Sequence, residues 1–216
     1  NLAAAVYAAV GQKDEARKQF SEALKLKPND PATLVNLARL DLSDGKAADA
    51  AKSFQKVLDG DPKNMIATVG LAAAASAAGD NAGAEKWLKK ASTDHPDAVE
   101  AQMALAQFYM GTRDFGKAKA VIDEAAKKSP DNAALSNARG MTQLGLNDIP
   151  GALTSFKQAT AQAPKAYGYA LNLARGHLAN RDVTSALGVL NEVLKVEPNY
   201  VPALAFAAAT ALQAGQ

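Results

Sequence analysis

The sequence predicts an all-α fold, a solenoid of antiparallel helix pairs. Three observations carry this prediction. Six prolines recur at 34-residue intervals, aspartates stand about halfway between them at the same interval, and apolar residues between these marks recur at helical spacing. Such a fixed period is typical of repeat proteins, in which each unit is one supersecondary element. The prolines are Pro28, Pro62, Pro96, Pro130, Pro164 and Pro198.

The first helix of each period, called helix A, is predicted to begin shortly after the proline. Leu34, Leu37 and Ala38 in the second period have the i, i+3, i+4 spacing that places side chains on one helical face. Asp41 follows on the same face and departs from the apolar pattern. We therefore predict a buried apolar face for helix A with one polar exception here.

The second helix of each period, helix B, is predicted to begin at the midpoint aspartate. Asp80, Asp114, Asp148 and Asp182 are 34 residues apart, and an aspartate suits the N-cap because its carboxylate accepts the free amide hydrogens of the first turn. Pro150 lies two residues after Asp148, where a helix needs no amide donor. The midpoint column therefore marks a second helix start in each of these periods.

Helix B carries a repeated triplet of a small, a large and a small or medium apolar residue. A small residue lets two helices approach closely, and the large residue fills the neighbouring space. We interpret the triplets as packing positions. They are Ala16, Phe20, Ala23; Ala50, Phe54, Val57; Ala84, Leu88, Ala91; Ala118, Ile122, Ala125; Ala152, Phe156, Ala159; and Ala186, Leu190, Val193.

A single helix pair of this size cannot bury enough apolar surface to be stable alone. It must stack against its neighbours, so the predicted product is an elongated array in which each repeat contacts the next.

Composition excludes several classes of function. The net charge of the 216 residues is +2, with 24 basic and 22 acidic residues intermixed, so no electrostatic footprint for nucleic acid is present. There is no cysteine, which removes disulfides and thiolate chemistry. The apolar run 201–212 is too short to span a bilayer. We expect a targeting segment, if the protein has one, to lie outside the residues shown.

The sequence offers no catalytic or metal-binding motif. The two histidines, His95 and His177, belong to different periods and lack zinc-site spacing; we interpret His177 as a packing residue. The glycine-containing segment 79–84 joins two helices and has neither a preceding strand nor a Lys-Ser/Thr ending, so it is not predicted to bind phosphate. We expect a chain that is not an enzyme and that needs no cofactor and no metal.

The repeat resembles the tetratricopeptide repeat family over the whole chain. That family's unit has a large residue, a Leu, a small residue and an aromatic in helix A, then Ala, an aromatic, Ala and a closing Pro in helix B. Tyr7 and Tyr109 occupy the aromatic position of helix A. The departures at this position are Asp41, Ala75, Gln143, His177 and Ala211.

The resemblance implies a right-handed superhelical solenoid, built as one array with fixed boundaries. Its expected parts are a partial repeat at 1–30, full repeats at 31–64, 65–98, 99–132, 133–166 and 167–200, and a lone helix A at 201–216. Because the pattern starts and ends within helix A, we expect apolar terminal faces and weak end-to-end self-association.

The alanine-rich style of the helices resembles bacterial scaffolds that accompany exopolysaccharide synthesis and export, including the lipoprotein of the PEP-CTERM/exosortase system. This resemblance implies a periplasmic protein, tethered to the outer membrane, with the cytoplasm as the alternative. The implied function is a protein-binding scaffold in envelope or exopolysaccharide assembly. The alternative is the substrate-recognition arm of a larger enzyme such as a glycosyltransferase, which the small number of asparagines at the sixth repeat position weakens.

The family implies a partner-binding groove lined by the A helices. Repeat positions 5, 9 and 12 share one helical face, and in this chain they are largely apolar, with methionines that could adapt to an apolar partner or simply pack between repeats. A protein or peptide is therefore the expected partner. The candidate groove residues are Asn36, Arg39, Met103, Gln107, Met110, Asn137, Met141, Asn172 and Arg175.

The four letters NLAR occur twice, giving the pairs Asn36 with Arg39 and Asn172 with Arg175. Residues three apart are neighbours on a helix, so each pair could present an amide and a guanidinium together to a partner's backbone or carboxylate. Alternatively, each asparagine bonds to the loop backbone of the next repeat while the arginine faces solvent. Residues that clamp chaperone C-termini in some members of the family are absent around both pairs.

Overall fold

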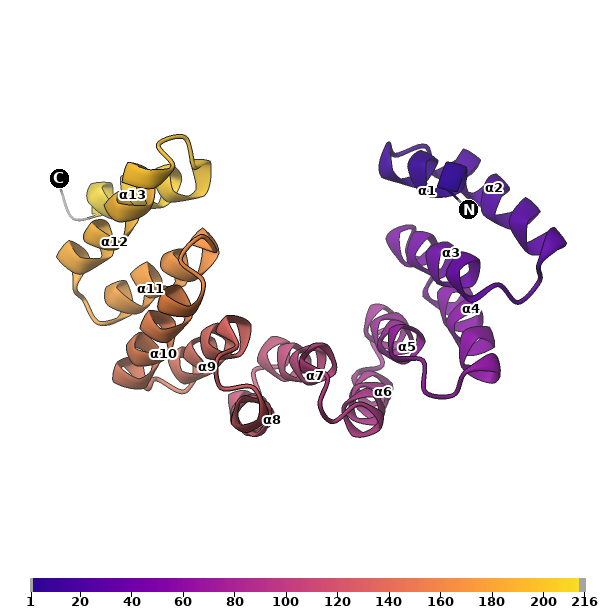
Figure 1. The fold of residues 1–216 in the computed structure, drawn as a ribbon, viewed down its shortest axis with the longest axis horizontal. Coiled ribbons are helices and arrows are strands. Elements are labelled where there is room, and N and C mark those ends of the chain that lie inside the picture. The colour runs from indigo at the N-terminus through magenta and orange to yellow at the C-terminus, as the bar shows by residue number, and fades with distance from the viewer. Residues whose placement is uncertain (1, 214–216) are drawn as a thin grey trace. The chain divides into compact units, whose positions relative to one another are not determined.

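The computed structural model describes residues 2–213, and all regular structure within that range is helical (Figure 1). The helices follow one another in antiparallel pairs, which confirms the predicted fold class. Their bounds are α1 (Leu2–Ala9), α2 (Lys13–Leu26), α3 (Pro31–Ser43), α4 (Ala47–Gly60), α5 (Met65–Ala77), α6 (Asn81–Asp94), α7 (Val99–Gly111), α8 (Phe115–Lys128), α9 (Ala133–Gly145), α10 (Ile149–Gln162), α11 (Tyr167–Ala179), α12 (Val183–Val196) and α13 (Val201–Gln213).

The A helices begin at the residues where the sequence places the repeat starts. Pro31, Met65, Val99, Ala133 and Tyr167 are the first residues of α3, α5, α7, α9 and α11. The 34-residue period is therefore expressed as one helix pair per repeat, with odd-numbered helices as A and even-numbered helices as B. No helix within residues 2–213 has both the length and the apolar character required to span a membrane.

The midpoint aspartates cap the B helices as predicted. The carboxylate of Asp80 accepts a hydrogen bond from the Gly83 amide at 2.8 Å, and Asp148 accepts one from the Gly151 amide at 3.0 Å. Asp114 and Asp182 cap α8 and α12 in the same way. This interaction satisfies an amide hydrogen that the helix itself leaves unpaired.

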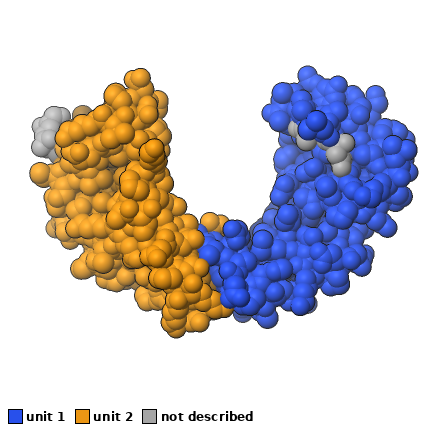
Figure 2. Space-filling model, in the orientation of Figure 1, with its two compact units in different colours: residues 1–105 blue, residues 106–216 orange. Residues whose placement is uncertain are grey.

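The chain consists of two compact units, residues 1–105 and 106–216 (Figure 2). In the first unit α1, α3 and α5 lie along one face and α2, α4 and α6 along the opposite face (Figure 1). In the second unit α9, α11 and α13 share one face and α8, α10 and α12 the other (Figure 1). Within each unit the A helices of successive repeats therefore form a continuous surface.

The core of each unit lies between its A and B helices. Phe20 and Phe54 in the first unit, and Phe156 in the second, are at most 1% exposed, and burying such a ring stabilises a fold by roughly 1.5–3 kcal/mol. The alanines of the triplets are buried beside them except for Ala23, which is half-buried. The packing interpretation of the triplets is confirmed.

Asp41, the polar exception on α3, is buried against an arginine from the preceding repeat. Its side chain is 5% exposed and accepts a hydrogen bond from Nη1 of Arg17 on α2, which raises the pKa of that guanidinium. Nη2 of Arg17 donates to Asp44 at 2.7 Å, and Lys13 also donates to Asp44 at 2.7 Å. Hydrogen bonds from Lys13 and then Arg17 lower the pKa of Asp44 below its ordinary value of 3.8.

Two other polar residues at the aromatic position face the following B helix. The side-chain oxygen of Gln143 accepts a hydrogen bond from the Ser155 hydroxyl on α10 at 2.7 Å. His177 packs with its side chain 12% exposed and its Nδ1 atom 3.6 Å from a carboxylate oxygen of Asp182. Both departures from the family pattern thus lie beside polar groups of helix B.

Candidate protein-binding site

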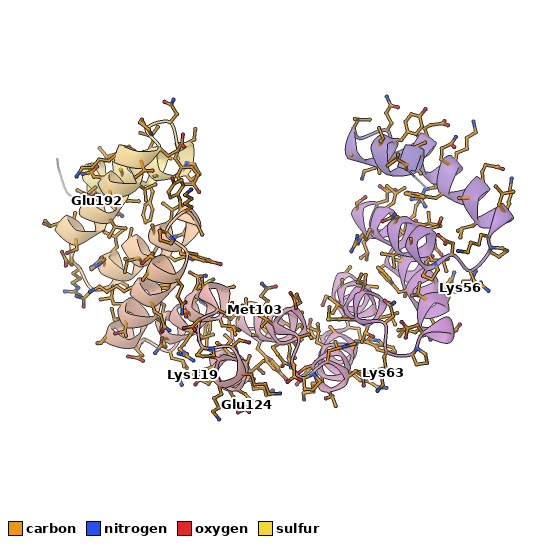
Figure 3. All side chains as sticks on the ribbon, viewed as in Figure 1. Lys56, Lys63, Met103, Lys119, Glu124 and Glu192 are labelled. Atoms are coloured by element: carbon orange, nitrogen blue, oxygen red, sulfur yellow. The ribbon has the colours of Figure 1, made fainter. Side chains whose placement is uncertain are left out.

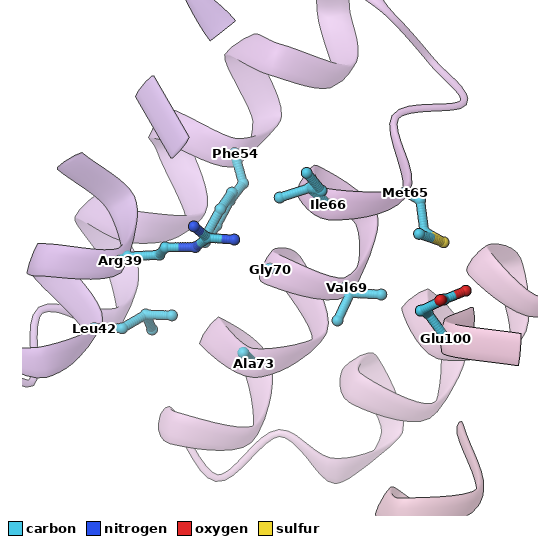
Figure 4. A pocket seen from close by; sticks show the side chains of 9 residues that line it. All are labelled: Arg39, Leu42, Phe54, Met65, Ile66, Val69, Gly70, Ala73 and Glu100. Atoms are coloured by element: carbon cyan, nitrogen blue, oxygen red, sulfur yellow. The ribbon is translucent and has the colours of Figure 1, made fainter. Parts of the chain in front are cut away.

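The A-helix face of the first unit carries a hollow of about 310 Å³ over α5 (Figure 4). We call it the α5 hollow. Most of its lining is apolar, and a single charged residue lies at each side. Its residues are Arg39 and Leu42 from α3, Phe54 from α4, Met65, Ile66, Val69, Gly70 and Ala73 from α5, and Glu100 from α7.

Gly70 allows α5 to lie directly on the ring of Phe54. A β-carbon at residue 70 would stand 2.4 Å from that ring, closer than any real contact permits. The equivalent position in two other A helices holds Asn36 or Asn172. The glycine therefore lets the Phe54 ring, which is only 1% exposed, form the bottom of the α5 hollow, where a larger residue at position 70 would displace it.

The two charges of the α5 hollow are free. Arg39 and Glu100 are both exposed, and neither forms an ion pair or a side-chain hydrogen bond with another residue in the range 2–213. In Figure 4 the two side chains lie on either side of α5. The hollow is thus an apolar surface with a cation at one edge and a carboxylate at the other.

The first asparagine–arginine pair borders a second hollow of the same unit. Asn36 and Arg39 line this hollow, of about 390 Å³, together with Lys13 from α2. Asn36 is half-buried and Arg39 is exposed. The i, i+3 spacing places both groups at one surface, as the sequence predicts.

In the second unit four candidate residues form one connected row across two A helices. The Nδ2 group of Asn172 on α11 donates to Oδ1 of Asn137 on α9 at 2.8 Å, and Nη1 of Arg175 donates to Oδ1 of Asn172 at 2.6 Å. Asn137 in turn points its amide at the sulfur of Met141, 3.7 Å away. The Arg175 guanidinium lies 5.6 Å from the ring centre of Phe206 on α13.

This row agrees in part with each of the two sequence interpretations of the NLAR pair. Asn172 bonds to the side chain of Asn137 on the neighbouring A helix, where the second interpretation expected loop backbone. Arg175 is exposed, yet it is hydrogen-bonded to Asn172, so the amide and guanidinium do stand together as the first interpretation expected. Whether a partner uses them stays a prediction.

The three remaining candidates lie on α7. Met103, seen in Figure 3, and Met110 are half-buried, whereas Gln107 is exposed. Met141, the methionine of the row on α9, is 43% exposed. None of the three α7 side chains forms a hydrogen bond within the described residues 2–213. By contrast, charged B-helix side chains such as Lys56 and Glu192 extend into solvent (Figure 3).

Sequence reasoning missed several residues of the α5 hollow. Glu100 is the second residue of α7 and Ile66 the second residue of α5, so neither occupies repeat positions 5, 9 or 12. Phe54 belongs to the core triplet and is 1% exposed, and its ring borders the hollow beside Gly70. A usable signal was the glycine at the sixth repeat position.

The histidines make structural contacts. The Nε2 atom of His95 is 2.6 Å from the backbone oxygen of Lys63, which joins the loops of two successive repeats. In the described range 2–213, no three His, Cys, Asp or Glu side chains gather in a way that could hold a metal ion.

Two family models match the chain, both described as tetratricopeptide repeat. One matches residues 41–98 and 75–141, and the other matches residues 1–64 and 137–202. No match was found among curated protein sequences.

Solved structures share the fold. Yeast Tom70 is 21% identical with a TM-score of 0.76, over 92% of this chain and 43% of that one. A thermophilic TPR protein of Thermus thermophilus is 24% identical with a TM-score of 0.63, over 81% and 95% of the two chains. YrrB, a TPR protein with an unusual peptide-binding site, is 18% identical with a TM-score of 0.57, over 86% and 95%.

The chain spans less than half of the length of Tom70, so the match concerns the repeat architecture. The second family model covers 1–64 and 137–202, more than half of the 216 residues, and the helix pairs have the period and packing described above. The chain belongs to the tetratricopeptide repeat family.

Proposed function

We propose that this chain is a protein-binding scaffold whose partners contact the exposed faces of its A helices. The main support for this proposal is the row of Asn137, Met141, Asn172 and Arg175 in the second unit. These groups are held in place by hydrogen bonds while Met141 and Arg175 remain exposed. Binding then orders fewer side chains, which lowers the entropic cost of association.

The chemistry of the row suits a peptide or protein. Amide groups can hydrogen-bond to a partner's backbone, a guanidinium can bind a carboxylate, and a methionine adapts to different apolar surfaces. Repeats of this family are generally non-enzymatic interaction modules, and the relative YrrB is described as having a peptide-binding site. The balanced charge of +2 supports a protein partner over nucleic acid.

Selection from a random-peptide phage library against the whole chain tests this proposal. Selected peptides would be measured by calorimetry against the wild type, a Met141→Ala/Arg175→Ala variant and a Lys157→Ala/Lys195→Ala control on the B helices. We expect the A-helix variant to weaken binding by about tenfold or more, as hot-spot truncations do. If only the B-helix control variant loses peptide binding, the binding surface lies on the B helices and the proposal is contradicted.

We propose assembly of a bacterial envelope or exopolysaccharide export system as the cellular setting, with the chain in the periplasm. The support is the alanine-rich style of the helices. A pull-down from envelope extract would compare the wild type with an Arg39→Ala/Met103→Ala/Met141→Ala/Arg175→Ala variant whose folding is checked by circular dichroism. Capture of export components by the wild type alone is expected, and capture of only cytosolic proteins from whole-cell extract would contradict this setting.

The substrate-recognition arm of an enzyme is the less favoured function. Asparagine occupies the sixth repeat position only at Asn36 and Asn172 in the seven A helices, so a continuous asparagine ladder for holding an extended substrate is lacking.

Weak end-to-end self-association is a further proposal. Leu2 and Val6 on α1 are 82% and 54% exposed, and Val201 and Leu212 on α13 are 69% and 81% exposed. Contact between such surfaces would remove apolar area from water. Light scattering should show a mass that rises with concentration, and a constant monomer mass at high concentration would contradict the proposal.

A further inference from the structure

We propose that the α5 hollow binds one large apolar side chain of an extended peptide that carries an acidic residue facing Arg39 and a basic residue facing Glu100. This inference rests on the proposed function and names the chemistry of one partner segment. It concerns the first unit, and the row in the second unit takes no part in it.

The size and lining of the hollow favour a single side chain. Its volume of about 310 Å³ lies at the lower end of the range for sites that enclose a whole small molecule. The wall is formed by aliphatic side chains and the bottom by the Phe54 ring, beside Gly70. A Leu, Met or Phe side chain could replace water there without leaving a buried polar group unpaired.

The bottom of the hollow is rigid, which favours binding by a defined side chain. Phe54 is 1% exposed and is packed in the core of the first unit with Leu34, Ala50 and Leu71. A preformed surface of this kind does not have to be ordered when a ligand binds. The two charged side chains at the edges, Arg39 and Glu100, are exposed.

The two free charges select the flanking residues of the peptide. Arg39 and Glu100 are exposed and lie on either side of α5, so a chain that crosses α5 passes both (Figure 4). Opposite charges at such rim positions guide orientation and exclude wrong partners more than they add affinity. A free amino acid does not fit this arrangement, because its carboxylate and ammonium groups are attached to the same carbon atom.

A charge-swapped variant tests the proposal whichever direction the bound peptide runs. Fluorescence anisotropy at low salt would measure an acidic–Phe–basic peptide, its basic–Phe–acidic reverse and an acidic–Ala–basic control. The wild type should prefer one order of charges by about threefold or more. The Arg39→Glu/Glu100→Lys variant should prefer the other order, and Phe→Ala in the peptide should weaken binding by about 10- to 100-fold.

A filling variant locates the apolar side chain. Ala73 is an exposed residue of the hollow, so Ala73→Phe should abolish binding, whereas Ala82→Phe at an exposed site of α6 should leave it unchanged. Circular dichroism would confirm that both variants fold. An unchanged charge preference in the swapped variant, or equal binding to Ala73→Phe, would overturn the proposal.

The two proposals fail in distinguishable ways. No binding of either Phe peptide to the wild type at about 1 mM, the weak limit of measurable affinity, would also overturn the inference. Phage-selected peptides that still depend on Met141 and Arg175 would then keep the proposed function intact. If no selected peptide depends on any A-helix residue, the proposed function itself fails.

Discussion

Replacing Arg17 by Met is expected to destabilise the contact between α2 and α3. The change removes the guanidinium that donates to the buried carboxylate of Asp41. Asp44 keeps its hydrogen bond from Lys13 at 2.7 Å, so the effect should come mainly from Asp41. The result would be a carboxylate with its partner gone, in a place that the repeat pattern of this family usually gives to an aromatic ring.

The size of the effect follows from the burial of the two side chains. Removing one partner of a fully buried ion pair costs about 3–5 kcal/mol, whereas an exposed pair contributes about 0–1 kcal/mol. The Asp41 side chain is 5% exposed and that of Arg17 is 27% exposed, so water can reach the site when the guanidinium is gone. We therefore expect a loss of about 2–3 kcal/mol, near the contribution of a hydrogen bond to a charged group.

Native-state hydrogen exchange is the appropriate assay, because repeats can open locally and a global melt would average over them. The amides of α2 and α3 should exchange faster in Arg17→Met, while those of α10 and α12 should be unchanged. The Arg17→Met/Asp41→Leu variant removes the unpaired charge as well. The opening free energy measured by exchange in this double variant should be within about 1 kcal/mol of the wild-type value, because apolar residues can often replace a buried ion pair.

Two results would refute this reasoning. If Arg17→Met lowers the local opening free energy by less than about 0.5 kcal/mol, water stabilises the Asp41 carboxylate as well as Arg17 does. A double variant no more stable than the single variant would mean that the cost arises from lost packing of the arginine stem, which is a separate source of stability.

Acid and two glycine substitutions test other contacts. Lys13 lowers the pKa of Asp44 in the folded state. The stability that ionised Asp44 contributes is therefore complete above the ordinary pKa of 3.8, and it is lost as pH falls through the folded-state pKa. Between about pH 5 and pH 3 the wild type should therefore lose more stability in urea unfolding than Asp44→Asn; equal losses would contradict this. A β-carbon at Gly140 would stand 2.5 Å from the Phe156 ring, so Gly140→Ala should cost about 1–3 kcal/mol. Gly188, on α12, has open space around it, so Gly188→Ala should stabilise the fold by about 0.5–1 kcal/mol. Thermal unfolding that gives Gly140→Ala a higher melting temperature than Gly188→Ala would contradict both expectations.

The helix boundaries could be predicted because they depend on nearby residues. A capping aspartate such as Asp148 acts on an amide three residues away, at Gly151, and this short range makes the cap visible as a column in the sequence. The buried triplets follow for the same reason, since helical spacing alone places them on one face.

The contacts between repeats could not be predicted in the same way. Arg17 and Asp41 are 24 residues apart, and Asn137 and Asn172 are 35 apart. Their pairing depends on how long side chains are oriented across a helix–helix contact, which no local pattern specifies. Gly70 is similar, because its consequence appears only where α5 lies on the Phe54 ring.

The polar residues that depart from the family pattern help to separate packing from binding. Gln143 bonds to Ser155, and His177 lies beside Asp182, so their polar atoms face the following B helix within their own repeat. The Gln143 oxygen is already hydrogen-bonded, and the His177 Nδ1 atom is buried without a hydrogen bond among the described residues, so neither atom is presented to a partner. The carboxylate of Asp41 likewise already accepts a hydrogen bond from Arg17.

The two candidate surfaces differ in the hydrogen bonds that a partner would have to break. In the second unit, a partner that uses Asn172 or Arg175 competes with the hydrogen bond that joins them at 2.6 Å. In the first unit, Arg39 and Glu100 have no such bonds within residues 2–213, so a partner displaces only water from them. A free charge gains its full interaction with a ligand, whereas a bonded one gains only the difference. Charge substitutions should therefore alter partner choice more strongly at the α5 hollow, and the row in the second unit should act chiefly through shape and backbone hydrogen bonding.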